Sequence, residues 1–177
     1  MGNWWRIPVR AALELHIHAD RRLAFEVLTA FDASAPGSEG SSKVLRRDDN
    51  GVLCEFHTPG KGLFWRPKIY RTVEYVTSQQ PEWIEFNTVE GPMASMRDRF
   101  DLEDEGGCTR LHYNSEFTMS GSVIGWLVSV LVVRPELKRM IHGHLQELKQ
   151  TMEARAARSR VYPQHPCGEP VGMANVS

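Results

Sequence analysis

The chain has 177 residues, of which 41% are hydrophobic and 24% are charged, a composition typical of a single globular domain. Its 21 Lys and Arg residues nearly balance its 22 Asp and Glu residues, so the formal net charge of −1 gives no general attraction for nucleic acid or acidic membranes. These values argue against a nucleic-acid-binding protein.

The beginning of the chain predicts an N-terminal arm over residues 1–10, then a strand and a helix. Residues 11–19 alternate apolar and polar side chains, which is the period of a half-buried strand. Asp20 is placed to cap a helix whose apolar stripe runs from Ala24 to Phe31. The run "SAPGSEG" then ends this helical region.

Recurring turn signals divide the middle of the chain into strands. "DDNG", "TPGKG", "SQQPE", "EGPM" and "EDEGG" each combine residues that favour turns. With the first strand they predict a seven-stranded antiparallel meander. The six further strands are expected over residues 41–47, 52–58, 63–77, 82–89, 95–103 and 108–118.

The C-terminal third changes to a helical period. Apolar residues recur at spacings of three and four from Leu137 to Met152, which predicts a long amphipathic helix. The apolar run 123–133 is too short to span a bilayer, which takes about 20 residues, although contact with a membrane surface stays open. Pro135 predicts a break between this run and the helix. The proline-rich tail 157–177 is predicted to be disordered.

Cysteine usage and the N-terminal sequence predict a cytoplasmic protein. Cys54, Cys108 and Cys167 are widely spaced and form no CxxC pair, which argues against a disulfide framework and a zinc site. The first residues lack the apolar run of a signal peptide, and Arg6 stands where a myristoylation signal has Ser or Thr.

Two segments carry a resemblance to a known superfamily. "RDRFDLEDEGGCTRLHYNSEF" (97–117) is similar to the last hairpin of polyketide cyclases, and residues 120–154, with "LQELK" near their end, resemble the C-terminal helix of that branch. With the element order, they resemble the START/SRPBCC superfamily over residues 11–156. The resemblance implies an α+β helix-grip fold, in which a curved seven-stranded antiparallel sheet wraps around a long C-terminal helix, with short helices between the first two strands. It also implies a cavity for a hydrophobic ligand, and no cofactor.

If the helix covers one face of the sheet, polar residues within the apolar rows of the strands mark the site. The apolar row of strand 95–103 contains Asp98, and the row expected to face inward in strand 63–77 contains Arg71. Asp98 would act as a general base and Arg71 would polarise a carbonyl. The alternatives are that these two residues only pair with each other, or that they orient a ligand without chemistry. The remaining expected ligand contacts are Ile69, Val73, Tyr75, Phe86, Met96, Phe100, Tyr113, Ser115, Phe117, Leu127, Val130, Leu137 and Ile141.

The first strand also carries side chains of the types that bind metal ions. Glu14, His16 and His18 fall on one face of this strand, and His112 is expected on the neighbouring strand. Because that face is the solvent side, exposed polar residues there need no function, and we expect no metal.

Three functions compete. The first is a binding protein for a lipid, quinone or polyketide-like molecule, and the second is a polyketide cyclase or dehydrase that uses the polar residues as acid and base. The third is a cochaperone-like interaction module whose contact surface is the apolar run before Pro135. The sequence favours ligand binding and leaves the ligand and the oligomeric state open.

Overall fold

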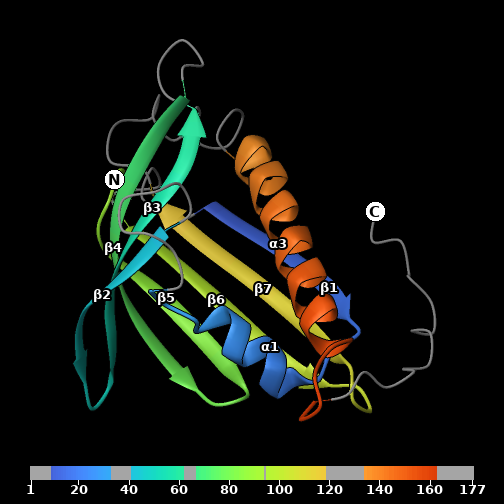
Figure 1. The fold of residues 1–177 in the computed structure, drawn as a ribbon. Coiled ribbons are helices and arrows are strands. Elements are labelled where there is room, and N and C mark those ends of the chain that lie inside the picture. The colour runs from blue at the N-terminus through green and yellow to red at the C-terminus, as the bar shows by residue number, and fades with distance from the viewer. Residues whose placement is uncertain (1–8, 33–40, 62–66, 94, 119–133, 163–177) are drawn as a thin grey trace, which may run out of the picture.

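The computed structural model describes residues 9–32, 41–61, 67–93, 95–118 and 134–162. Seven strands form one antiparallel sheet in the order β1-β7-β6-β5-β4-β3-β2 (Figure 1). Every neighbouring pair except β1 and β7 is also consecutive in the chain, so the predicted meander is confirmed. The strands are β1 (Val9–Ile17), β2 (Ser41–Asp48), β3 (Gly51–Lys61), β4 (Pro67–Gln79), β5 (Trp83–Glu90), β6 (Ser95–Asp104) and β7 (Thr109–Thr118).

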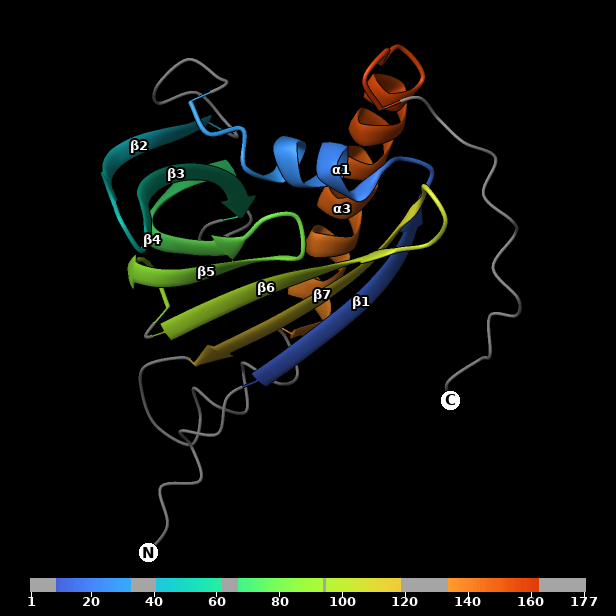
Figure 2. The ribbon, with the colours of Figure 1, turned by 90° about the horizontal axis from the view of Figure 1, so that it is seen from below.

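Two described helices, α1 (Arg21–Leu28) and α3 (Arg134–Ala156), lie on the concave side of this curved sheet (Figure 2). We call the face that the helices cover the inner face. Asp20 caps α1 as predicted, because its Oδ1 accepts a hydrogen bond from the Arg22 backbone N–H at 2.7 Å. The helix ends at Leu28, so Phe31 lies beyond it and still packs against the core.

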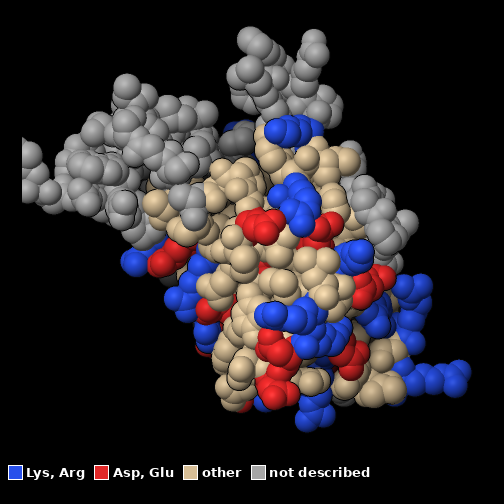
Figure 3. Space-filling view, turned by 90° about the vertical axis from the view of Figure 1, so that its left-hand side faces the viewer, with Lys and Arg blue, Asp and Glu red and all other residues tan. Residues whose placement is uncertain are grey.

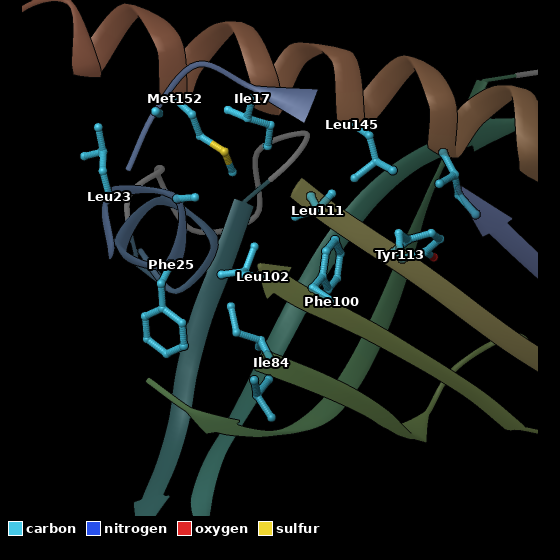
Figure 4. Close-up of a cluster of buried hydrophobic side chains, with 14 of the residues drawn as sticks. Ile17, Leu23, Phe25, Ile84, Phe100, Leu102, Leu111, Tyr113, Leu145 and Met152 are labelled. Carbon is cyan, nitrogen blue, oxygen red and sulfur yellow. The ribbon is translucent and has the colours of Figure 1, made fainter. Parts of the chain in front are cut away.

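The core lies where the two helices meet the middle of the sheet. Ile84, Leu102 and Leu111 point from the inner face toward Leu23 of α1 and Met152 of α3 (Figure 4). All five side chains are at most 3% exposed. This burial supplies the main favourable term of folding.

A group of polar contacts ties the C-terminal half of α3 to the end of β1. The Lys149 ammonium donates to the carbonyl oxygen of His16 at 2.5 Å, and Glu153 Oε1 accepts from the His18 backbone N–H at 3.0 Å. Lys149 and Glu153 also pair with each other at 2.7 Å. We refer to these contacts as the clasp.

One predicted turn is misplaced. The run "TPGKG" was expected to end a strand, but β3 continues to Lys61 and pairs with β4 down to Pro67. The other strand boundaries agree with the prediction to within a few residues. The glycine at position 51 has a clear packing reason, since a Cβ on Gly51 would collide with the carbonyl oxygen of Val76.

The predicted break near Pro135 and the apolar run before it involve residues outside the described part of the chain. The helix α3 is described from Arg134 onward. Its residues Ile141, Leu145 and Met152 are buried, as the period predicted. None of the described helices is both long and apolar enough to cross a membrane.

Candidate functional site

The strands β6 and β7 place a polar pair on the inner face. Their register puts Asp98 opposite Ser115 and Phe100 opposite Tyr113, and cross-strand partners share a face. Tyr113 and Ser115 are 3% and 1% exposed. The structure thus brings Asp98, Tyr113 and Ser115 together as the sequence predicted.

Asp98 is held by a hydrogen bond from the Tyr113 hydroxyl to its Oδ1 at 2.9 Å. Burial raises the pKa of Asp98 above its ordinary value, while the nearby hydroxyls of Ser115 and Tyr113 oppose this rise. Burial, reinforced by the charge of Asp98, also raises the pKa of Tyr113. Tyr113 is therefore a neutral hydrogen-bond donor at neutral pH.

Ser115 has an unusual environment. Its Oγ is fully buried and makes no aligned hydrogen bond within the described part of the chain, although it lies near enough to Asp98 to affect the pKa of that carboxyl. A buried hydroxyl without a partner is rare in folded proteins because its lost hydration is uncompensated. Such a group on the inner face indicates a place where a ligand atom would complete the hydrogen bonding.

Glu74 of β4 is a candidate site residue that was not expected from the sequence. It lies opposite the buried Cys54 and opposite Thr88, on the inner face. Burial and, to a smaller extent, the charge of Asp98 raise the pKa of Glu74, the Thr72 hydroxyl acts in the opposite direction, and the resulting pKa is about 7. Glu74 therefore changes protonation near neutral pH, which suits it to proton transfer.

The predicted facing of β4 is wrong. Arg71 lies on the outer face of the sheet, where its Nε donates to Glu55 at 2.6 Å and its Nη1 to Glu90 at 2.9 Å. These contacts raise the pKa of Arg71 and hold it away from Asp98. The prediction assigned the residues of β4 to the wrong faces of the sheet. The apolar row of β3 pairs with the alternate set of β4 residues and places that set on the inner face.

The same correction applies to three expected ligand contacts. Ile69 is 42% exposed, and the Tyr75 hydroxyl donates to Asp48 at the surface. Val73 is buried but lies opposite Glu55 and Glu90, which belong to the outer charged layer. None of the three is on the inner face, so they do not belong to the candidate site.

A row of aromatic rings borders the acidic residues. The rings of Phe31, Phe56, Phe86, Phe100 and Tyr113 contact one another in sequence, with centroids 4.9–6.4 Å apart. This inclined packing is the favoured geometry for aromatic pairs. The expected contacts Phe86 and Phe100 thus form one wall of the site, and Met96 and Phe117 lie in the next inner row.

A hollow of about 340 Å³ lies between α1 and the β2–β3 hairpin. Phe25, Phe31, Val52 and Val76 contribute its apolar lining, and Arg47 lies at its polar side. Phe86 lies between Val76 and Asp98 in the register of the sheet, so it separates this hollow from the polar residues.

The remaining expected contacts are less informative. Ile141 is 8% exposed and belongs to the core. Leu127 and Val130 lie outside the described residues, as does the side chain of Leu137. The apolar run before Pro135 that was expected to form an interaction surface is likewise not described.

The histidines of β1 have other partners. His16 bonds Glu105 at 2.7 Å, and His112 lies 3.6 Å from Glu14 and 3.4 Å from Glu103. One cluster of possible ligand atoms, those of His16, His18 and Cys108, gathers within 4.8 Å. However, Cys108 is disulfide-bonded, which the cysteine pattern did not predict, so it offers no thiolate. Cys54 is free and buried, and burial raises its pKa to about 11.

The outer face carries charged residues of both signs. Arg97 and Arg99 of β6 converge on Glu85, and Arg110 pairs with Glu105. Figure 3 shows Lys and Arg side chains interspersed with Asp and Glu on one side of the molecule. Glu85 is itself buried beneath these arginines, whereas the other pairs are partly exposed and of a kind that stabilises a protein little.

Comparisons with known proteins agree with this architecture. No protein-family model matches the sequence, and no curated protein sequence is significantly similar to it. Among solved structures, TTHA0849 from Thermus thermophilus superposes with a TM-score of 0.69 at 18% identity, over 85% of this chain and 100% of that one.

Two further solved structures show the same arrangement. The ZhuI aromatase/cyclase from Streptomyces sp. R1128 matches with a TM-score of 0.65 and 13% identity over 88% of this chain and 99% of that one. A START superfamily protein from Mycobacterium smegmatis matches with a TM-score of 0.58 and 14% identity, over 84% and 97% of the two chains. At these identities the similarity concerns the fold alone. The chain therefore has the helix-grip fold of the START/SRPBCC superfamily, as its strand order and C-terminal helix predicted.

Proposed function

We propose that the protein binds a hydrophobic small molecule, such as a lipid, a quinone or a polyketide-like compound, in a cavity between the inner face of the sheet and α3. The observation that carries this proposal is the group formed by the half-buried Asp98 and the buried Tyr113 and Ser115 beside an aromatic wall. A few convergent polar groups among apolar side chains are typical of small-molecule sites, in which they orient a mostly apolar ligand.

Mass spectrometry of the protein purified under native conditions tests this proposal. We expect a small molecule to be retained at a defined stoichiometry and to be lost or bound less tightly in Asp98→Asn, because that change alters the hydrogen bonding at the site. The matched control is Asp101→Asn, an acid on the outer side of the same strand that pairs with Arg99. Equal retention by wild type and Asp98→Asn would remove Asp98 from the site.

A second candidate is an enzyme of the polyketide cyclase or dehydrase type. It is favoured by Glu74, whose pKa of about 7 lets it take up and release a proton at neutral pH. The neutral Tyr113 hydroxyl donates its one proton to Asp98 in this structure, and in this candidate it would turn that proton to a substrate oxygen when the substrate binds. Because Arg71 lies on the outer face of the sheet, Tyr113 would polarise the substrate carbonyl in its place. Aromatase/cyclases among the solved structures with this fold agree with this candidate.

Turnover of a short poly-β-ketone thioester separates the two candidates. If the protein is an enzyme, we expect product formation with an apparent pKa near 7 that disappears in Glu74→Gln. The control Glu90→Gln, on the outer face, should behave as wild type. Ligand binding without turnover in wild type would leave the binding role and exclude this enzymatic activity.

A further inference from the structure

The polar part of the inner face carries two carboxyls, Glu74 and Asp98, and no basic partner for them among the side chains that the structure describes. Neither Glu74 nor Asp98 forms an ion pair with any described residue, and no described Lys or Arg lowers the pKa of either carboxyl. The basic residues on the inner side of β2–β4 are peripheral, because Arg47 lines the hollow beside α1 and Lys68 lies over the Tyr70 ring at the far end of β4. Each carboxylate is therefore affected by the negative charge of the other, and no described cation offsets that charge.

Three polar groups on this part of the inner face share one chemical property. The carboxylate of Asp98, the carboxylate of Glu74 and the Oγ of Ser115 all accept hydrogen bonds. The Tyr113 hydroxyl donates to Asp98 at 2.9 Å, and the Ser115 hydroxyl lies near enough to lower the pKa of that carboxyl. Ser115 is 1% exposed, and its Oγ has no aligned partner among the described residues. The site thus has unused acceptors and excess negative charge.

We propose that the ligand carries an amino group that is protonated when bound, attached to an aromatic or similarly apolar body. The ammonium would donate to Asp98, Glu74 and Ser115, while the apolar body would lie against the rings of Phe86 and Phe100. This inference rests on the proposed binding function and specifies its ligand class.

Other head groups fit less well for electrostatic reasons. A carboxylate or phosphate would add negative charge beside two carboxyls in a poorly hydrated place, which is unfavourable. A neutral alcohol can occupy one acceptor but leaves the negative charge unpaired. An ammonium supplies donors for several acceptors and also pairs the charge, and such charge-assisted hydrogen bonds are stronger than neutral ones.

Isothermal titration calorimetry with naphthylmethylamine, naphthylmethanol and naphthoate tests the inference, because these probes share one ring system and differ in the head group. In wild type at mildly alkaline pH, we expect the amine to bind at least about tenfold more tightly than the alcohol, and the acid to bind most weakly. In Asp98→Asn and Glu74→Gln the advantage of the amine over the alcohol should fall below about threefold.

The outcomes separate the inference from the function on which it rests. Equal affinity of wild type for the amine and the alcohol would overturn the amine preference and leave ligand binding intact. Absence of binding by all three probes, with no molecule retained in native purification, would overturn the proposed function itself. Glu90→Gln is the control for general charge, because it removes an exposed carboxylate from the outer face and should keep the amine preference. If a variant fails to fold, the three affinities of wild type alone decide.

Discussion

The inner face has two regions that share the same strands and differ in chemistry. Beside α1, Ile84, Leu102 and Leu111 pack against both helices and form the core. One to two rows further along the strands, Glu74, Asp98 and Ser115 occupy equivalent inward positions. The first region follows the pattern that stabilises a fold, whereas the second leaves polar groups incompletely paired. This difference agrees with the binding role proposed above for the second region, since incompletely paired polar groups add little to stability.

The largest expected effect is in the apolar region. Leu111→Ala removes a side chain that is 1% exposed, so it should lower the free energy of unfolding by about 2–5 kcal/mol through lost burial and the cavity left behind. Urea unfolding measures this change. Leu45→Ala, at a residue 42% exposed, is the control and should change stability little. Comparable losses in the two variants would contradict the assignment of the core.

The contribution of Glu74 to stability should change with pH in the opposite sense to that of a carboxyl whose pKa is lowered by folding. Because folding raises the pKa of Glu74 from 4.5 to about 7, the folded state binds the proton more tightly, and stability falls as pH rises between these values. Glu74→Gln should therefore be more stable than wild type by roughly 1–3 kcal/mol above neutral pH and similar to it in acid. Unfolding curves at both ends of this pH range measure the difference. A constant difference across the range would show that Glu74 is not buried as described.

Ser115→Ala is expected to separate stability from binding. Loss of a buried hydroxyl without an aligned partner should leave the free energy of unfolding unchanged or raise it by about 1 kcal/mol. Ligand affinity should nevertheless fall. Ser41→Ala is a matched control, since the Ser41 Oγ is also buried and unpartnered but lies on β2, away from Asp98. A parallel loss of affinity in both variants would assign the effect to packing.

The smallest effect is expected for Arg71→Gln. The exposed side chain of Arg71 pairs with Glu55 and Glu90 on the outer face, so neither stability nor ligand affinity should change appreciably. Thermal unfolding and the titrations described above provide the measurements. A selective loss of ligand affinity would show that Arg71 contributes to the site and would contradict its placement on the outer face of β4.

The difference between these strands also explains which features were readable in the sequence. Strand order and the inward rows of β6 and β7 were predicted because their apolar residues alternate clearly around Asp98 and Ser115. In β4 both faces carry apolar side chains, Val73 on one and Val76 on the other, and both are at most 4% exposed. Alternation alone therefore could not choose the face, and Glu74 was missed. The signal that could have found it is the row from Val52 to Phe56, whose pairing with β4 fixes the parity.

The clasp limits how the protein can open for a ligand. It lies at the Ile17 end of β1, about 20 Å along the strand from Ala11, which is the neighbour of Ser115. A shift of the whole of α3 away from the sheet would break charge-assisted hydrogen bonds of Lys149 and Glu153, whereas a tilt about that end would keep them. Of the two movements, a tilt of α3 about its C-terminal half would therefore cost the fewer polar contacts.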